Sequence, residues 1–335
     1  MTEFWNVLRE VDPQYAIREA DQPLRVIICG RAGAGKRTLA RGLFEGECSG
    51  VPGSSIAIDI LDMPDDVPVA LPTADLYLYV AREGDELGPL QRNHLRQLSH
   101  RSGRVIRVVN RSDVRGWSTP VSVPVDEGLG IIPGPTIAMS IADRQSIQRE
   151  LVPRILKELP QLALPMGRHL TTARDPAADF LIADTARVNA EFAIISSLPA
   201  LVPVVGTLAS VGTDMIILTK NQVMLLLKLA LMYQRPIDNR MQVFAEVAPV
   251  IGAAFFWRSA ARSLVAMLPG PLAIAPRGAV AYVGTYVMGR AGQYYYRSGM
   301  RPSADLLDSF REDALRQLGG FTPLLARVGR RFKLP

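Results

Sequence analysis

Apolar and polar positions over the first half of the chain form two patterns, short apolar runs and helical repeats. Five short runs are rich in β-branched and aromatic residues, as strands buried in a sheet are. These runs are LRVIIC (24–29), SSIAIDIL (54–61), ADLYLYVA (74–81), RVIRVVN (104–110) and the weaker PTIAMS (135–140). Helical patterns separate and follow them, at 38–46, 85–100 and 146–159. Strands that alternate with helices predict a mostly parallel α/β sheet with helices on both faces.

The pattern changes after about residue 160. Strand-like runs stop, and long apolar helical stretches broken by Pro and Gly begin. The predicted fold class is therefore α/β followed by all-α. We expect four parts: an N-terminal amphipathic helical segment at 1–22, an α/β domain at 23–160, a hydrophobic helical domain at 161–318 and a basic tail at 319–335.

The helical half contains one long uncharged stretch. From Phe192 to Thr213 the chain runs 22 residues without a charge, formally enough to span a bilayer as a helix. Pro199 and Pro203 interrupt the stretch, however, and favour the bend of a helical hairpin. Polar residues at seven-residue spacing on the following helix fit a packed bundle or an interfacial hairpin better than a lipid-surrounded span. The sequence leaves transmembrane, interfacial and soluble bundle arrangements open.

A turn near Gly206 would fix the register of this hairpin. It would set Asp184 opposite Lys228 and Glu191 opposite Asn221. Each carboxylate would then meet a polar or cationic partner, which offsets the cost of removing it from water. Polar stripes that both face water are the competing interpretation.

The charge is divided unevenly between the two halves. Residues 1–150 carry a net charge of −3 and residues 151–335 a net charge of +9. A half that is both apolar and cationic fits an anionic membrane surface better than nucleic acid, which is bound through polar loops or aromatic platforms. We therefore expect peripheral or hairpin-inserted attachment to the cytoplasmic face of the cell membrane and no nucleic-acid partner. A simple bias toward arginine, which makes up 33 of the 38 basic residues, is the competing explanation.

Cysteine and histidine usage adds two expectations. Cys29 and Cys48 are too few for a disulfide framework, which indicates a reducing compartment. The three histidines show no metal-ligand spacing, and we expect them on the solvated surface.

The stretch CGRAGAGKRT (29–38) has the spacing of a phosphate-binding loop, with four residues between Gly30 and Gly35 and with Lys36 next. It follows a predicted strand and opens a predicted helix, which is the context this motif requires. Backbone N–H groups of the loop would surround the phosphates, and the Lys36 ammonium would neutralise them. The residues expected at the phosphates are Gly30, Gly33, Ala34, Gly35, Lys36, Arg37 and Thr38.

Three more polar stretches follow predicted strands, in chain order. ILDMPD (60–65) places Asp62 to reach Mg²⁺ through water. NRSD (110–113) places Asp113 to accept two hydrogen bonds from guanine, a donor pair that adenine lacks. MSIAD (139–143) brings Ser140 and the backbone N–H of Ile141 toward the base. Each stretch alone is weak, since an Asn-x-x-Asp after a strand is commonly a turn, but together they are specific.

In these stretches the segment 24–158 resembles an Era-like GTPase of the small Ras-like fold. The matching positions are Gly30, Gly35, Lys36 and Thr38 in the phosphate loop, Asp62, then Asn110, Arg111 and Asp113, and Ser140. The flanking helical sequences resemble those of GTPases fused to a membrane-associated helical domain of unknown function. The resemblance implies a Ras-like P-loop domain followed by a hydrophobic helical-hairpin bundle, with GTP or GDP as ligand.

Several positions depart from the pattern of that family. Arg37 stands where a hydroxyl would bind Mg²⁺, and Asp65 replaces the glycine that meets the γ-phosphate. No threonine between Thr38 and Asp62 can act as the first-switch sensor. The guanine end is retained, because Arg111 in place of lysine still supplies a flat cationic cover for the base. The sequence therefore predicts nucleotide binding with weak or absent hydrolysis, and it leaves a role for Mg²⁺ open.

Three functions remain as hypotheses. The first is a guanine-nucleotide-binding switch or scaffold at the membrane. The second is a nucleotide-free pseudo-GTPase subunit that pairs with a homologous GTPase or with another copy of this chain. The third is an active membrane-remodelling GTPase, which the shortened first switch disfavours.

Overall fold

The protein forms two compact units, Arg18–Ala178 and a second unit that combines Met1–Ile17 with Asp179–Pro335. The computed structural model describes residues 11–44, 56–64, 69–85, 88–99, 104–111, 135–196, 211–235, 237 and 274–319. The divisions between the units fall within helices α2 (Pro13–Ala20) and α8 (Thr171–Ile195). Residues 161–178, which the sequence analysis assigned to the helical domain, therefore cluster with the α/β unit.

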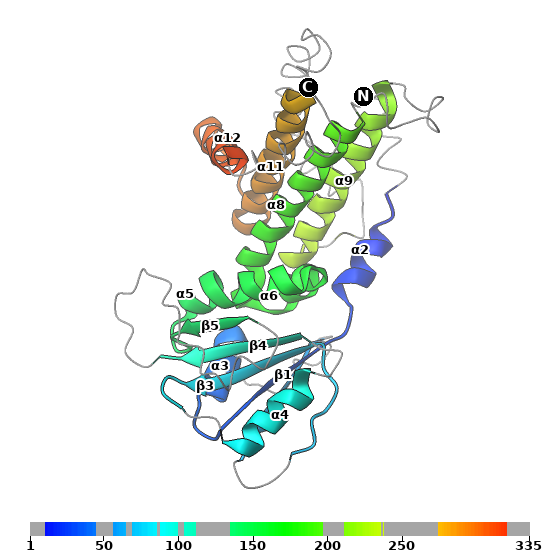
Figure 1. Cartoon of the computed structure of the whole chain (residues 1–335). Helices are drawn as coiled ribbons and strands as arrows, with labels where there is room; N and C mark the ends of the chain where they lie inside the picture. Colours follow the sequence, from blue (N-terminus) through cyan, green and yellow to red (C-terminus); the bar gives the residue numbers. More distant parts are fainter. Residues whose placement is uncertain are drawn as a thin grey trace, which may run out of the picture. The chain divides into compact units, whose positions relative to one another are not determined.

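The first unit is built on a five-stranded sheet in which every described pairing is parallel (Figure 1). The strands are β1 (Leu24–Gly30), β2 (Ile56–Asp62), β3 (Leu76–Arg82), β4 (Arg104–Asn110) and β5 (Thr136–Met139). Their order across the sheet is β2-β1-β3-β4-β5. The predicted parallel α/β sheet is confirmed, and each strand lies within about two residues of its predicted bounds.

Helices cover the sheet. They are α3 (Lys36–Leu43), α4 (Pro89–Ser99), α5 (Arg144–Ser146), a π-helical turn (Ile147–Leu151), α6 (Val152–Glu158), a 3₁₀ turn (Pro160–Leu162) and α7 (Ala163–His169). Leu98 of α4 packs into one buried layer with Ile27 and Tyr77 of the sheet. Figure 1 shows α3 on the other side. Both faces of β1, β3 and β4 are therefore buried, which is why these strands read as continuous apolar runs.

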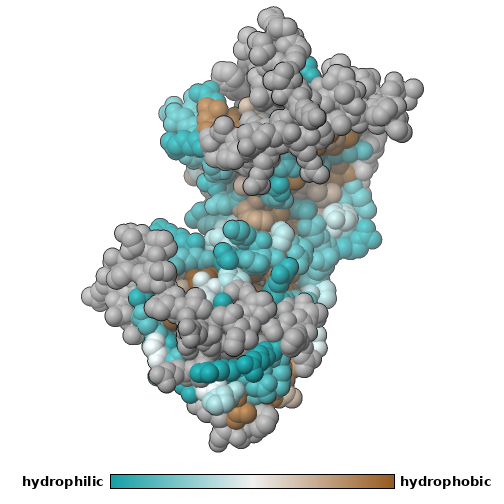
Figure 2. All heavy atoms as spheres, viewed as in Figure 1, coloured by the Kyte–Doolittle hydropathy of each residue, from teal (hydrophilic) through white to brown (hydrophobic). Residues whose placement is uncertain are grey.

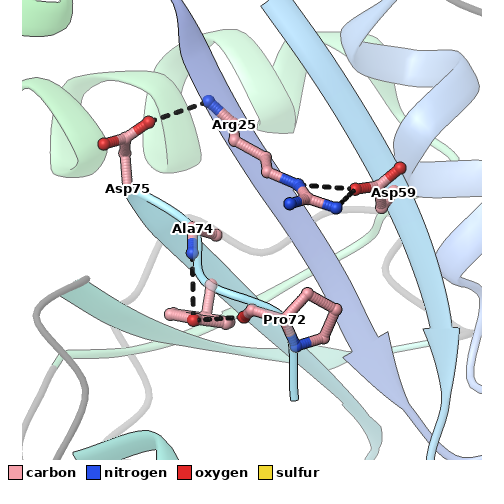
Figure 3. A network of polar contacts seen from close by, with 6 residues as sticks. Arg25, Asp59, Pro72, Ala74 and Asp75 are labelled. Carbon is pink, nitrogen blue, oxygen red and sulfur yellow. Dashed lines mark hydrogen bonds and ion pairs between the residues drawn. The ribbon is translucent and has the colours of Figure 1, made fainter. Parts of the chain in front are cut away.

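A polar network ties the first three strands together (Figure 3). The backbone N–H of Arg25 donates to the carboxylate of Asp75 at 2.9 Å, and the Arg25 guanidinium pairs with Asp59 at 2.8 Å. The Tyr77 hydroxyl donates to the carbonyl of Pro72 at 2.6 Å and accepts from the N–H of Ala74 at 3.1 Å. These contacts join β1 to β2 and to the segment that enters β3.

The expectation that His94 lies on the solvated surface is wrong. His94 is 1% exposed on α4, and its Nε2 accepts a hydrogen bond of 3.1 Å from the backbone N–H of Val69. The helix turns this side chain inward because His94 lies four residues before the buried Leu98, on the same face. The ring therefore holds the chain that follows β2.

The second unit is helical. Its described helices are the first part of α2, the distal part of α8, α9 (Val211–Met232), α11 (Ile274–Ser298) and α12 (Ala304–Gly319). Figure 1 shows α8, α9 and α11 side by side. They share a buried amide–hydroxyl network, in which Thr285 accepts hydrogen bonds from Asn189 at 2.9 Å and from Gln222 at 2.8 Å. Buried amides and hydroxyls of this kind require partners, and here three helices supply them.

The predicted cross-helix pairing of carboxylates is corrected by the structure. Asn221 donates to Asn189 at 2.7 Å, so its partner on α8 lies two residues from the predicted Glu191. Asp184 and Glu191 instead form ion pairs with Arg187 of their own helix, at 2.7 and 2.9 Å. The residues at i+3 and i+4 on a helix surface are close enough to satisfy both ends of one guanidinium. Residue 206, where the turn was expected, lies outside the described residues.

None of the described helices combines the length and apolar character needed to cross a membrane. In Figure 2 the described surface of the helical unit mixes hydrophilic and hydrophobic residues. The exposed large apolar side chains among its described residues are Tyr15, Val188, Ile195, Ile217, Met300 and Leu315. The predicted tail from residue 320 onward lies outside the described residues.

Candidate functional site

The sheet order creates a natural place for a ligand. β1 lies between β2 and β3, so the chain leaves the sheet in opposite directions on the two sides of β1. In open α/β sheets the crevice at the carboxyl ends of such strands is the usual ligand site. The loop 31–35 begins at that end of β1. Strand pairing places Gly30 beside Asp62, and Asn110 beside both Arg82 and Met139, at the same edge.

Lys36 is the buried cation of this edge. Its side chain is 4% exposed, and its ammonium donates to the carbonyl of Gly30 at 2.9 Å and to the carbonyl of Arg31. The same nitrogen lies 2.6 Å from a carboxylate oxygen of Asp62. An ammonium has three donors. All three of them therefore have partners within the chain, two inside the loop and one at the end of β2.

Gly35 joins the loop to the two strands at the far side of the edge. Its φ is +104°, a conformation that favours glycine, and a Cβ there would lie 2.1 Å from the side chain of Ile141. Asn110 contacts the same segment, since its amide donates to the carbonyl of Ala34 at 3.3 Å. The structure thus brings the predicted phosphate loop together with the predicted base-recognising residues Asn110 and Ile141.

The base-side residues are held in place by backbone and ionic contacts. The N–H of Arg111 donates to the carbonyl of Met139 at 3.0 Å, and the Arg111 guanidinium pairs with Glu83 at 2.8 Å. The carbonyl of Ser140 accepts from the N–H of Asp143 at 3.3 Å. Ser140 is partly buried beside this turn. Arg111 and Ser140 therefore lie on the two neighbouring strand ends where the sequence analysis expected them.

The described residues do not form a protein-ligated metal site. Arg37 and Thr38 are exposed in the first turn of α3, and Asp62 offers its carboxylate to Lys36. Mg²⁺ requires several oxygen ligands in a near-octahedral shell. Among the described residues there is no cluster of three His, Cys, Asp or Glu side chains that suits a metal ion. Asp62, the carboxylate expected to reach Mg²⁺ through water, is thus held by Lys36, and Arg37 stands where a hydroxyl ligand was expected.

Cys29 lies in the buried layer directly before the loop. Burial raises the pKa of its thiol to about 12, although the nearby charge of Lys36 acts in the opposite direction. The thiol is therefore neutral at physiological pH. It packs as a small apolar side chain with Ile27 and Tyr79.

Two residues of the site were missed in the sequence analysis. Arg82 is the last residue of β3 and Glu83 follows it, and they contact the loop and Arg111 respectively. Their signal was a charged pair that follows a buried strand at the carboxyl edge. Two residues that the sequence analysis did single out, Asp65 and Asp113, lie outside the described residues.

Comparison of the chain with models of known protein families and with curated proteins finds no match. Four loop carbonyls, those of Gly30, Arg31, Gly33 and Ala34, accept hydrogen bonds from side chains. A loop whose carbonyls are held in this way, beside a buried ammonium and at a helix N-terminus, is suited to binding an anion.

Proposed function

We propose that this protein binds guanine nucleotides through a Ras-like P-loop domain and hydrolyses GTP weakly or not at all. The observation that carries the proposal is the position of Lys36. Its buried ammonium lies under a glycine loop at the topological switch point, 2.6 Å from Asp62. Asn110 binds the loop from the neighbouring strand end. Phosphates would replace Asp62 on the ammonium and receive N–H groups of the loop.

Selectivity for guanine is proposed from the other end of the site. Asp113 would accept the two donors of guanine, and an unpaired carboxylate would penalise adenine. Arg111 supplies a flat cation beside the base, held by Glu83. Ser140 and Ile141 follow β5 at the adjoining strand end. Weak hydrolysis is expected because Arg37 occupies the position of a metal-binding hydroxyl.

Calorimetry with GTP, GDP and ATP, with and without Mg²⁺, tests this function. We expect GTP and GDP to bind and ATP to bind at least about tenfold more weakly, which corresponds to one unsatisfied buried acceptor. Lys36→Ala should abolish binding. Lys157→Ala, which removes an exposed lysine of α6 in the same unit, is the matched control. Equal affinity for ATP and GTP would contradict the proposal.

The nucleotide-free scaffold is the second candidate, and one observation favours it. The three donors of Lys36 already have partners in the chain, so the loop is electrostatically satisfied without a ligand. Mass spectrometry of nucleotides released from the purified, heat-denatured protein separates the two candidates. If the purified protein releases no nucleotide and calorimetry detects no binding of added nucleotide, the scaffold is favoured. In that case this chain pairs with a homologous GTPase or with a second copy.

We also propose that the helical unit lies at an anionic membrane surface. This unit has 18 Lys and Arg against 13 Asp and Glu, a net charge of +5, which supports the proposal because each basic residue near such a surface contributes about 1 kcal/mol. Flotation with vesicles that contain phosphatidylserine should recover the protein at low salt, and raised salt should release it. Equal recovery with uncharged vesicles would contradict an electrostatic attachment.

A further inference from the structure

The end of β3 contacts both ends of the candidate site through two consecutive residues. Arg82 donates to the phosphate loop, from Nε at 3.0 Å and from Nη2 at 2.6 Å, and both bonds go to the carbonyl of Gly33. Glu83 pairs with Arg111 at 2.8 Å. Arg82 is the last residue of β3, and Glu83 is the first residue of the turn that follows it. One dipeptide can therefore reach the loop with one side chain and the base-side arginine with the other.

Gly33 is shaped for the contact with Arg82. Its φ is +74°, and a Cβ at this position would lie 2.6 Å from Arg82 Nη2. Any other residue would thus displace the guanidinium from the loop. The loop glycine at 33 serves the approach of an arginine from within the chain as well as the approach of a ligand.

The contact fixes the direction of a peptide group. In a trans peptide the C=O and the N–H point in opposite directions. The carbonyl oxygen of the peptide between Gly33 and Ala34 points to Arg82. The N–H of the same peptide, that of Ala34, therefore points the other way and donates to the carbonyl of Arg31 at 3.2 Å. Asn110 holds the next carbonyl, that of Ala34, in the same way. The two side chains thereby orient two successive peptides of the loop before any ligand binds.

Arg82 is itself held at its backbone. Its N–H donates to the carboxylate of Asp85 at 3.0 Å, and the N–H of Glu83 donates to the carbonyl of Asn110 at 3.1 Å. The dipeptide is thus attached to β4 and to its own turn. Its two side chains therefore start from a defined position at the sheet edge.

We infer that Arg82 and Glu83 are positioning residues with separate tasks: Arg82 orients the phosphate loop, and Glu83 holds Arg111 beside the base. This inference rests on the proposed nucleotide-binding function. It assigns phosphate affinity and base affinity to two neighbouring side chains that can be altered one at a time.

Calorimetry with tripolyphosphate, guanosine and GTP tests the separation. Arg82→Ala should lower the affinity for tripolyphosphate and for GTP by about tenfold, which is the value of a charged hydrogen bond. The affinity for guanosine should not change. Arg82→Lys should restore only part of the loss, because one ammonium does not reproduce the forked contact. Glu83→Gln should lower the affinity for guanosine and for GTP by about threefold and leave the affinity for tripolyphosphate unchanged.

Two matched controls accompany these variants. Arg41→Ala removes an exposed arginine from the last turn of α3. Glu158→Gln removes one partner of the Arg154–Glu158 ion pair on α6. Neither control should change the affinity for any of the three probes.

Hydrogen exchange of the ligand-free protein gives a readout that does not depend on nucleotide. Arg82→Ala should speed exchange in the peptide that covers residues 30–36, and Glu83→Gln should leave that peptide unchanged. Variants that weaken tripolyphosphate and guanosine alike, or a loop whose exchange does not respond to Arg82→Ala, would overturn the separate tasks. Failure of the unmodified protein to bind GTP would overturn the proposed nucleotide binding and, with it, the effects of Arg82 and Glu83 on affinity. Faster hydrogen exchange of residues 30–36 in Arg82→Ala would in that case still show that Arg82 orients the loop.

Discussion

The carboxylate of Asp62 lies 2.6 Å from the ammonium of Lys36 and provides the last partner of a cation already bonded to two loop carbonyls. Asp62 is 64% exposed, whereas Lys36 is 4% exposed. The carboxylate thus reaches in from the solvent side, where a phosphate would also approach. A bound phosphate and Asp62 would compete for the same donor.

Asp62→Asn is therefore expected to raise the affinity for GTP measured in EDTA. The amide cannot match a carboxylate as partner of Lys36, and an ion pair whose carboxylate is exposed to solvent is worth about 1 kcal/mol, or about fivefold in affinity. Asp59→Asn, which breaks the Arg25–Asp59 pair on the same strand, should leave the affinity unchanged. A fall in affinity on Asp62→Asn would mean that the carboxylate supports the bound state instead.

Arg37→Ser should make nucleotide binding depend on Mg²⁺. The guanidinium of Arg37 is exposed at the start of α3, where it can meet phosphate oxygens directly. A serine hydroxyl would provide a metal ligand in its place. We expect GTP affinity to be the same with and without millimolar Mg²⁺ in the unmodified protein, and to rise about tenfold with Mg²⁺ in the variant. Arg41→Ser is the control.

Cys29 should resist thiol reagents until the α/β unit unfolds. Burial raises the pKa of the thiol from 9.0 to about 12, so the reactive thiolate is absent near pH 8. Because the folded state holds this proton more tightly, the free energy of unfolding should fall as pH rises from 9 toward 12. The measurement is reaction with Ellman's reagent in a Cys48→Ser background, before and after denaturation. Rapid reaction of the native protein would show that Cys29 is accessible.

Thr285→Val should destabilise the helical unit. The hydroxyl of Thr285 is fully buried and accepts from Asn189 and Gln222. Valine has nearly the same shape but leaves both amides without this acceptor, which costs about 2–4 kcal/mol. Chemical denaturation measures the change, and Thr285→Ser, which keeps the hydroxyl, should lose much less. Equal losses in the two variants would point to packing rather than hydrogen bonding.

Gly289→Ala should also destabilise this unit, through contact between helices. An added Cβ would lie 2.8 and 2.9 Å from the side chain of Ile182 and 3.1 Å from that of Leu225. Overpacking of this kind costs about 1–3 kcal/mol, which the better helix propensity of alanine offsets only in part. A second substitution, Ile182→Ala, makes room, so the double variant should lose less than the sum of the single variants. Strict additivity would show that the two positions do not touch.

Much of the α/β unit could be predicted because its signals are local. The strand ending at Gly30 and the helix beginning at Lys36 show in the pattern of apolar residues and glycines. Asp62 and Asn110 each end a strand and Ser140 follows one, and parallel strands bring such positions to one edge. Which strand lies beside which was not readable from the sequence, since pairing depends on contacts between distant segments.

The sequence by itself determined the order of strands and helices, the glycine loop and the uneven distribution of charge, since these depend only on neighbouring residues. The tertiary structure alone decided the contacts that the sequence had not indicated. These are the hydrogen bonds between Arg82 and Gly33, between the buried His94 and Val69, and between Asn221 and Asn189. Each of these contacts joins residues at least 25 positions apart. Packing chooses the partner of a buried polar group from everything that folding brings near, and no local pattern records that choice.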